Sequence, residues 1–304
     1  MATEKEEEFM SLKKIVIITL IAFAIKLWVF KPFIIPSSSM DSTLIQGDYL
    51  IVNSWENSLF GNHLDLECGD VVTFRYPLDP ADLNDKMVFA KRCIGLPGDT
   101  ITIYESMTST DNKSLNFDFL ISDPKSAINW DILSEINVHL GGRTINNSWL
   151  LNLSPSQIEH LEKLDSEIIL TKHLEDINMG NLSIFPSDTL IKWNRDYYGP
   201  IYIPKSGESI ELNLSSINIY KKIITTYEGH TLSVVGSVFT IDGNLSSNYT
   251  FEQNYYFMLG DNRHHSQDSR HWGFVPEDHL LATCSMVLFN IENFSTDRLL
   301  KRIK

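Results

Sequence analysis

Residues 88–99 read Val88-Phe89-Ala90-Lys91-Arg92-Cys93-Ile94-Gly95-Leu96-Pro97-Gly98-Asp99, and they establish the chain as β-rich. The mostly apolar first part predicts a strand, and Leu96–Asp99 has the pattern of a type II turn. Proline supplies a φ of about −65° at the second position of such a turn, and glycine accepts the positive φ that follows. A second strand is predicted directly after the turn, at Thr100–Tyr104.

Lys91 occupies an unusual place in this first strand. Because side chains alternate between the two faces of a strand, Phe89, Lys91 and Cys93 share one face. An apolar environment disfavours the charged form of a lysine, so it lowers the pKa toward the range that a general base requires. On these residues alone, an ordinary lysine that extends its ammonium group into solvent is the favoured interpretation.

The rest of the chain repeats the β pattern. Short apolar segments bounded by turn residues predict strands at Tyr49–Val52, Asp70–Arg75, Met87–Ile94, Ser209–Leu214, Thr231–Val235, Ser237–Ile241 and Tyr255–Leu259. A helix is predicted at Pro155–Leu164, because Ser154 can cap it and proline suits its first position. We therefore expect a mainly β protein with an antiparallel β-sheet core and a β-rich insertion that contains at least one short helix.

The N-terminal part contains an apolar stretch, Ile15–Phe30, with Lys26 as its only charged residue. Such a stretch predicts a transmembrane helix of about 24 Å, with the lysine extended toward the head groups. Lys13 and Lys14 precede the stretch, and positive charge favours the cytoplasmic side. A cleaved signal peptide with its apolar part at Ile15–Ile25 is the alternative.

These patterns divide the chain into five parts. We expect a cytoplasmic tail at 1–11, a transmembrane anchor at 12–32, a β core at 33–104 and 251–296, an inserted β-rich subdomain at 105–250, and a basic tail at 297–304. The β core of this single-pass protein is expected on the outer face of the cytoplasmic membrane.

Composition narrows the classes of function. The chain has 304 residues and a formal net charge of −14, which argues against a general nucleic-acid binder, since that role needs a basic surface. Cys68, Cys93 and Cys284 are far apart in the sequence and form no CxxC pair, so neither a zinc knuckle nor a disulfide framework is indicated. The three cysteines still allow a single disulfide.

Two further segments carry reactive side chains. Ile35–Leu44 contains a serine run, and a serine attacks only if a neighbouring group removes its proton. Met258–Gly273 is dense in polar groups. Its Asp261, His264, His265 and His271 include ligand types that suit zinc, whereas Asp261, Arg263, Asp268 and Arg270 can form a charged network that fixes a loop. The residues alone leave both interpretations open.

In their order along the chain, these segments resemble bacterial type I signal peptidases, the leader peptidases of family S26. The resemblance rests on Pro36-Ser-Ser-Ser-Met40, Gly69-Asp-Val-Val72, Lys91-Arg-Cys-Ile-Gly-Leu-Pro-Gly-Asp99 and Gly260-Asp-Asn-Arg-His-His-Ser-Gln-Asp-Ser-Arg270, all following the apolar stretch. It implies a membrane-bound serine endopeptidase that cleaves N-terminal signal peptides from exported preproteins. It covers the anchor and roughly residues 33–104 and 251–290.

The resemblance also assigns roles to individual residues. Ser39 is implied to be the nucleophile and Lys91 the general base. The oxyanion hole is implied to consist of the Ser37 hydroxyl and the Ser39 N–H, and Ser266 is implied to orient the lysine. The implied salt-bridge frame is Asp261, Arg263, Asp268 and Arg270. The implied substrate-binding residues are Phe33, Ile35, Pro36, Met40, Leu44, Phe89 and Ala90.

Partners follow from the same resemblance. We expect preproteins with small residues at P1 and P3, contact with membrane lipid, no nucleic acid, no cofactor, no metal and a monomeric protein. Two positions depart from the family pattern: Ser42 stands where a proline is common, and Cys68 stands where an arginine is usual. The alternative functions are a catalytically inactive homologue that acts as a membrane-tethered preprotein-binding module, and a different Ser/Lys hydrolase.

Overall fold

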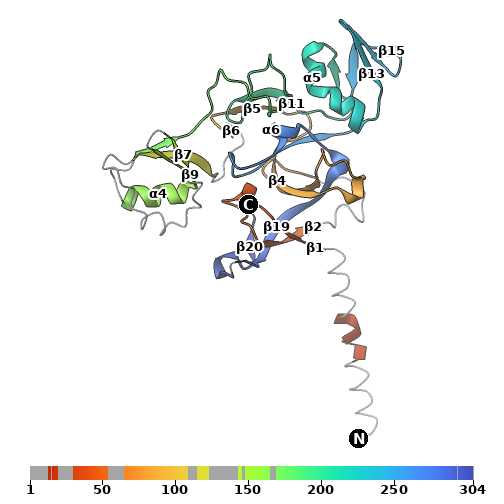
Figure 1. The fold of residues 1–304 in the computed structure, drawn as a ribbon. Coiled ribbons are helices and arrows are strands. Elements are labelled where there is room, and N and C mark those ends of the chain that lie inside the picture. The colour runs from red at the N-terminus through yellow and green to blue at the C-terminus, as the bar shows by residue number, and fades with distance from the viewer. Residues whose placement is uncertain are drawn as a thin grey trace, which may run out of the picture.

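The computed structural model describes residues 13–14, 16–19, 30–53, 65–108, 115–122, 143–145, 148–164, 169–292 and 294–303. Within these ranges the protein is mainly β with few helices, and the strands pair antiparallel (Figure 1). The predicted β class of the chain is therefore confirmed.

The largest sheet has eight strands and contains both ends of the described β structure. Its order is β1-β2-β19-β3-β4-β17-β18, and β20 pairs with β19. The strands are β1 (Phe30–Ile34), β2 (Asp48–Asn53), β3 (Val71–Arg75), β4 (Val88–Gly95), β17 (Tyr255–Leu259), β18 (Val275–Pro276), β19 (Leu280–Asn290) and β20 (Lys301–Arg302). Segments from the first hundred residues and from the last fifty thus form one sheet.

Strand β4 and its turn match the sequence prediction closely. The strand predicted at Met87–Ile94 spans Val88–Gly95. In the turn that follows, the amide of Asp99 donates to the carbonyl of Leu96 at 3.0 Å, and Gly98 has a φ of 97°. The turn leads into β5 (Thr100–Tyr104), as predicted.

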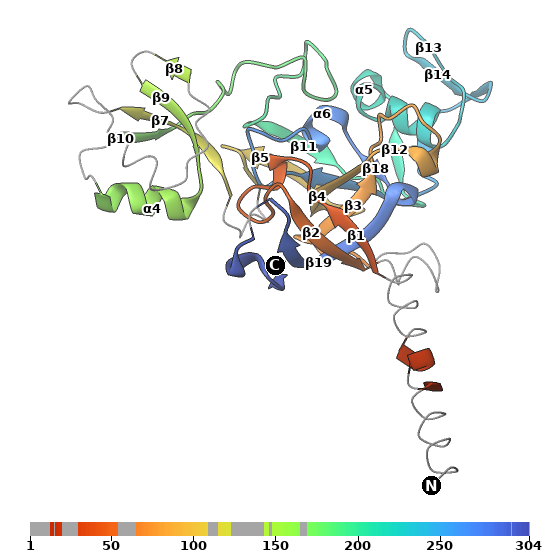
Figure 2. The same ribbon diagram turned by 60° about the horizontal axis from the view of Figure 1, so that its bottom comes forward.

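Four smaller sheets lie around the main one. The four-stranded sheet β10-β7-β9-β8 carries α4 and lies on one side of the molecule, whereas α5 and β13 lie on the other (Figures 1 and 2). Its elements are β7 (Phe117–Ser122), β8 (Arg143–Ile145), β9 (Ser148–Leu153), α4 (Pro155–Leu164) and β10 (Ile169–Lys172). The helix predicted at Pro155–Leu164 has the predicted bounds, and the amide of Gln157 donates to the Ser154 hydroxyl at 3.3 Å.

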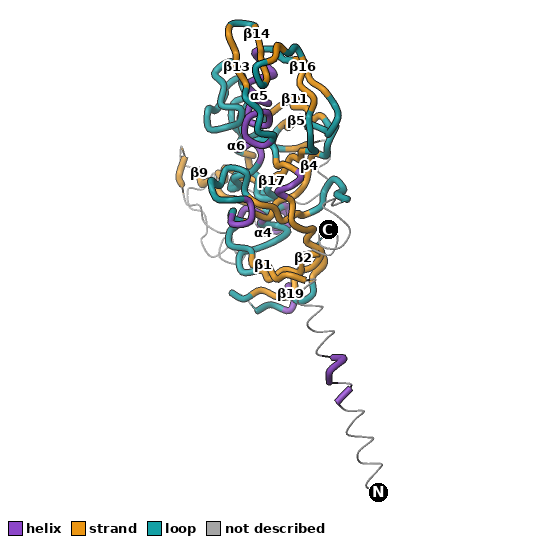
Figure 3. The backbone as a smooth tube through the Cα atoms, turned by 90° about the vertical axis from the view of Figure 1, so that its right-hand side faces the viewer, coloured by secondary structure: helices purple, strands orange, loops and turns teal. Residues whose placement is uncertain are grey.

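The remaining elements complete the body. In Figure 3, β13 and β14 lie at one end of the β-rich body and β19 lies at its opposite end. The other sheets are β11-β5-β6, β12-β16 and β13-β14-β15. Their further strands are β6 (Met107–Thr108), β11 (Tyr198–Tyr202), β12 (Ser209–Glu211), β13 (Leu232–Val235), β14 (Val238–Ile241), β15 (Asn244–Leu245) and β16 (Asn248–Thr250), and the remaining helices are η1 (Ser38–Met40), η2 (Leu83–Asp85), α5 (Leu214–Lys222), η3 (Ile223–Tyr227), α6 (Ser269–Trp272), η4 (Glu277–His279) and η5 (Thr296–Arg298).

The strand predicted at Ser209–Leu214 is wrong in its second half. β12 ends at Glu211, and α5 begins at Leu214. The cause is Asn213, whose side-chain oxygen accepts hydrogen bonds from the amides of Ser215 at 3.0 Å and Ser216 at 2.8 Å. This N-cap satisfies amides that a helix start leaves unpaired, so it favours a helix where the apolar pattern indicated a strand.

The described N-terminal residues do not test the predicted membrane anchor. Most of the stretch at 15–30 lies outside the described residues, and within the described ranges no helix is both long and apolar enough to cross a membrane. Strand β1 begins at Phe30, two residues before the predicted end of the anchor, because Phe30–Ile34 pairs with β2.

Candidate active site

Ser39 lies in the short helix η1, directly after the first strand of the main sheet. Its loop closes through bonds from the amides of Thr43 at 3.1 Å and Leu44 at 2.9 Å to the carbonyl of Met40. The side chains of Met40 and Leu44 are buried in a core cluster beneath the main sheet. Ser42 has a φ of 89°, in the left-handed region that side chains other than glycine rarely adopt. The position where the family commonly carries proline therefore has a backbone conformation that proline cannot take.

Side chains from distant parts of the chain fix this loop from two directions. Arg92, on β4, donates to the Thr43 hydroxyl at 3.0 Å. Arg298, in η5, donates to the Thr43 carbonyl at 3.2 Å and also forms a buried ion pair with Asp48. Since Asp48 lies at the start of β2, the pair joins the C-terminal segment to the sheet beside the loop.

Lys91 approaches the same loop from β4, in the centre of the main sheet. Its Nζ lies 2.5 Å from the Ser39 hydroxyl oxygen and 3.2 Å from the carbonyl oxygen of Ala90. Only 4% of Lys91 is exposed. The ring of Phe89 lies 5.6 Å from Nζ, so the amine has an aromatic neighbour on the face that the strand alternation predicts.

Burial lowers the pKa of Lys91 from 10.5 to about 8. Loss of hydration is the main cause, and the negative charges of Asp268 and Asp261 partly oppose it. An amine with this pKa is neutral in an appreciable fraction of molecules near neutral pH. A neutral amine within hydrogen-bond distance of a hydroxyl is suited to remove its proton.

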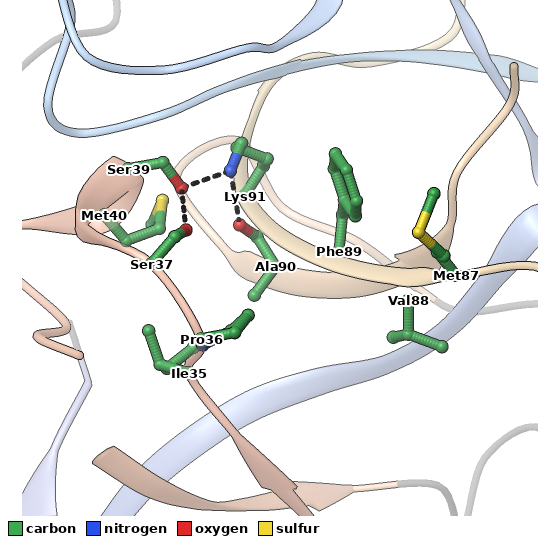
Figure 4. Close-up of a pocket in the computed structure, with 10 residues that line it drawn as sticks. All are labelled: Ile35, Pro36, Ser37, Ser39, Met40, Met87, Val88, Phe89, Ala90 and Lys91. Atoms are coloured by element: carbon green, nitrogen blue, oxygen red, sulfur yellow. Dashed lines mark hydrogen bonds between the residues drawn. The ribbon is translucent and has the colours of Figure 1, made fainter. Parts of the chain in front are cut away.

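An apolar cleft of about 290 Å³ opens beside these two side chains. Figure 4 shows Ser37, Ser39 and Lys91 converging on it, with the Ser37 and Ser39 hydroxyl oxygens 3.3 Å apart. The lining residues are Ile35, Pro36, Ser37, Ser39, Met40, Met87, Val88, Phe89, Ala90 and Lys91. A hydroxyl pair and an amine thus face a space large enough for small apolar side chains.

The structure brings most of the predicted substrate-binding residues together. Five of the seven line the cleft: Ile35, Pro36, Met40, Phe89 and Ala90. The other two, Phe33 and Leu44, belong to the adjacent core cluster, where Leu44 is fully buried and Phe33 is partly buried. Met87 and Val88 line the cleft without having been predicted, although their place at the start of the same strand is a signal that sequence analysis could have used.

Ser266 lies close to the loop that carries Ser39, and its hydroxyl donates to the carbonyl of Gln267 at 3.4 Å. Gly260, directly after β17, separates Ser266 from that loop. A Cβ atom at Gly260 would lie 2.1 Å from the Ser266 hydroxyl oxygen and 2.5 Å from the carbonyl oxygen of Ser39. Only glycine fits at this point, which sequence analysis did not identify.

Two buried ion pairs surround the site. Asp268 pairs with Arg270 at 2.7 Å, and both side chains are fully buried. Burial alone would raise the pKa of Asp268, but Arg270 lowers it overall by charge and hydrogen bonding. Asp261 accepts from Arg92 at 2.8 and 2.6 Å, and Arg263 donates to the carbonyls of Gly260 and Ser106.

The four predicted frame residues are therefore all buried in one region, and Arg92 joins them. Arg92 was not predicted as part of this frame. A signal was available, because an arginine inside a mostly apolar strand needs an acidic partner if it is buried.

The family model described as "Signal peptidase, peptidase S26" matches residues 9–173 and 206–289, which is more than half of the chain.

The chain belongs to the S26 signal peptidase family.

Individual relatives agree with the family model. Signal peptidase I of Buchnera aphidicola subsp. Schizaphis graminum is 26% identical over 292 residues, covering 93% of this chain and 76% of the relative. Signal peptidase I of Aquifex aeolicus is 26% identical over 281 residues, covering 91% of this chain and 84% of the relative. Signal peptidase I of Pseudomonas aeruginosa is 37% identical over 89 residues, covering 27% of this chain and 30% of the relative.

The predicted family and class of enzyme are thus confirmed: this signal peptidase is a type I enzyme and a serine protease that cleaves signal peptides. The roles of its individual residues, its membrane anchor and its domain boundaries stay predictions.

Proposed function

We propose that this signal peptidase is anchored in the cytoplasmic membrane by the part of residues 12–32 that precedes β1, and that it uses Ser39 as nucleophile and Lys91 as general base. The distance of 2.5 Å between Lys91 Nζ and the Ser39 hydroxyl, two side chains of buried residues, carries the proposal. The lowered pKa of Lys91 supports it, because a base must be neutral before it can accept a proton.

Acylation begins with proton transfer from Ser39 to the neutral amine of Lys91. The hydroxyl oxygen attacks the carbonyl carbon of the scissile peptide bond, and a tetrahedral oxyanion forms. The hydroxyl of Ser37 and the N–H of Ser39 donate hydrogen bonds to that oxyanion. The ammonium of Lys91 then returns the proton to the leaving nitrogen, the C–N bond breaks, and the mature N-terminus departs.

Deacylation reverses these roles with water. Lys91 removes a proton from water, the resulting hydroxide attacks the ester carbon, and the bond to the Ser39 oxygen breaks. The proton passes back to that oxygen, and the signal peptide leaves with a new carboxylate. Lys91 ends each cycle as the neutral amine.

Substrate preference follows from the shape of the cleft. An extended preprotein segment can lie along the edge formed by residues 35–37 and 87–90, with alternate side chains directed into the cleft. A shared volume of about 290 Å³ between ordered walls favours small side chains at P1 and P3. Exported preproteins with an Ala-x-Ala site are therefore the expected substrates.

The proposed domain arrangement follows the family resemblance. Residues 1–11 form the cytoplasmic tail, 33–104 and 251–296 form the catalytic core on the outer face, 105–250 form the insertion, and 297–304 form the basic tail that can contact lipid. We infer that the enzyme requires neither metal nor cofactor, since the proposed steps use side chains and backbone groups alone. Because one chain supplies all of these groups, we also infer a monomer.

The test is cleavage of a purified Ala-x-Ala preprotein by the full chain in detergent. Wild-type protein should cut after the second alanine, whereas Ser39→Ala should leave the preprotein intact. Full cleavage by Ser39→Ala would contradict the proposal. Stable capture of intact preprotein by the wild-type protein, without cleavage, would instead favour an inactive binding module.

A further inference from the structure

The two carbonyl groups that flank the nucleophile are both held by Asn262. Its side-chain amide donates to the carbonyl of Ser38 at 3.2 Å, and its backbone N–H donates to the carbonyl of Ser39 at 3.2 Å. Asn262 is 3% exposed. The helix η1, and with it the direction of the Ser39 hydroxyl, is therefore fixed from the Gly260–Arg270 segment.

The orientation of the Asn262 amide has a consequence for its neighbour. A backbone carbonyl only accepts hydrogen bonds, so the nitrogen of the amide must face Ser38 and its oxygen must face away. That oxygen lies 3.0 Å from the side-chain nitrogen of Asn152 on β9. Asn152 is thus the donor that completes the pairing of Asn262, and it comes from the 105–250 segment, in which sequence analysis found no chemistry.

Asn152 is itself held on both sides. It lies opposite Asp118 in the register of β7 and β9, and its nitrogen also donates to the Asp118 carboxylate at 3.0 Å. Its side-chain oxygen accepts from Asn116 at 3.3 Å. Burial would raise the pKa of Asp118, but hydrogen bonds from His264, His265 and Asn152 lower it overall, so the carboxylate is a charged acceptor that orients Asn152.

A backbone contact joins the two segments directly at this point. Asn116 forms a parallel bridge with Asn262: its N–H donates to the carbonyl of Asp261 at 3.2 Å, and its carbonyl accepts from the N–H of Arg263 at 3.2 Å. The contact aligns the start of β7 with the segment that holds the nucleophile loop. The series of side-chain hydrogen bonds from Asp118 through Asn152 to Asn262 lies beside this bridge.

From these contacts we propose that Asn152 is a positioning residue for the nucleophile. It acts through Asn262 on the Ser38 and Ser39 carbonyls and keeps the Ser39 hydroxyl within reach of Lys91. The sheet that contains β7 and β9 then helps to position the active-site serine. The inference rests on the proposed role of Ser39, which the Ser39→Ala experiment tests separately.

Three variants of the full chain separate positioning from folding. Asn152→Ala removes the donor. Asn152→Asp keeps the size but places a carboxylate against the Asn262 oxygen and the Asp118 carboxylate, which is repulsive. Ser154→Ala is the matched control, because it removes the N-cap hydroxyl of α4 two residues away, whose bonds go to Ser156 and Gln157.

The measurement is kcat and KM for an Ala-x-Ala preprotein from pH 6 to 10, normalised to the folded fraction from tryptophan fluorescence. Both Asn152 variants should lower kcat about tenfold or more, because a small displacement of a nucleophile costs much of its rate. KM should change by less than about twofold, since the cleft is untouched. The midpoint of the pH profile should stay at its wild-type value, since Lys91 keeps its surroundings.

Two results would overturn the positioning role. One is a normalised kcat for Asn152→Ala that equals that of Ser154→Ala, which would make Asn152 purely structural. The other is a further large loss of kcat when Asn152→Ala is added to Asn262→Ala. If Asn152 acts only through Asn262, its removal should have no additional effect once Asn262 has been replaced. Cleavage by Ser39→Ala would overturn the proposed function, and with it the positioning role, whereas inactive Ser39→Ala with undiminished kcat in the Asn152 variants would overturn the positioning role alone.

Discussion

Replacement of Lys91 by methionine should abolish cleavage and at the same time stabilise the fold. The two side chains have similar lengths, but methionine can neither accept a proton nor carry a charge. In the wild-type protein, burial lowers the pKa of Lys91 from 10.5 to about 8. The unfolded chain therefore binds the lysine proton more tightly than the folded protein does, and protonation below pH 10.5 destabilises the fold.

The magnitude follows from this difference in pKa. Each pKa unit corresponds to about 1.4 kcal/mol, so the wild-type protein loses about 3 kcal/mol of unfolding free energy at pH 7 and about 1 kcal/mol at pH 10. The loss starts as pH falls below the unfolded pKa and is complete below the folded one. Lys91→Met is free of it, so its stability advantage should grow by about 2 kcal/mol between pH 10 and pH 7.

The assay is urea unfolding of both full-length proteins in the same detergent at pH 7 and pH 10, alongside preprotein cleavage from pH 6 to 10. Wild-type kcat/KM should rise with pH and level off above about pH 8, as the free base becomes the main form. Cleavage by Lys91→Met should be absent throughout. A stability difference that is the same at both pH values, or cleavage by the variant, would refute the assignment of Lys91 as a buried base.

Three further substitutions test the surroundings of the site. Ser42→Pro should cost about 3 kcal/mol of unfolding free energy in urea titration, because residue 42 has a φ of 89° and proline is fixed at about −65°. Gly260→Ala should lower kcat about 100-fold in the preprotein assay, since the new methyl group would displace both Ser266 and the carbonyl of Ser39. Arg298→Ala should cost about 3 kcal/mol in the same titration, because it leaves the fully buried carboxylate of Asp48 without its ion-pair partner.

Each of these expectations can fail clearly. Unchanged stability in Ser42→Pro would mean that the loop adopts another backbone path. Normal turnover by Gly260→Ala would show that Ser266 can move away without disturbing the nucleophile. Lys301→Ala is the control for the last variant, because Lys301 is exposed. Equal losses of unfolding free energy in Arg298→Ala and Lys301→Ala would argue against a specific pair between Arg298 and Asp48.

Local sequence patterns predicted strands and helices correctly where the packing of the folded protein favours the same structure. Strand β4 and helix α4 lie where alternation, the proline–glycine turn and the serine N-cap placed them. Strand β19 escaped prediction, although it is the longest described strand. Its burial alternates over Leu280–Ser285, but register shifts between Cys284 and Met286 and between Val287 and Phe289 break the alternation further along the strand, so the pattern that identifies a strand is interrupted.

Sequence analysis could predict the residues of the site that carry reactive groups, but not those that support them. Ser39 and Lys91 carry reactive groups, so a resemblance between short motifs was enough to select them. Gly260 and Asn152 act through shape and hydrogen-bond direction, and both depend on residues more than a hundred positions away or on the approach of another loop. Such dependence leaves no local pattern, which explains why the 105–250 segment gave no sign of a link to the nucleophile.

The contact between Arg298 and the Thr43 carbonyl has a consequence for the timing of synthesis. It joins residues 255 positions apart, so the loop that carries Ser39 receives its last support only after almost all of the chain has left the ribosome. Pairings of such long range are also slow to form, because the intervening chain must first be brought together. A newly made chain therefore carries its serine and its lysine well before it holds them in place. We therefore expect proteolytic activity to appear only late in the synthesis of the chain.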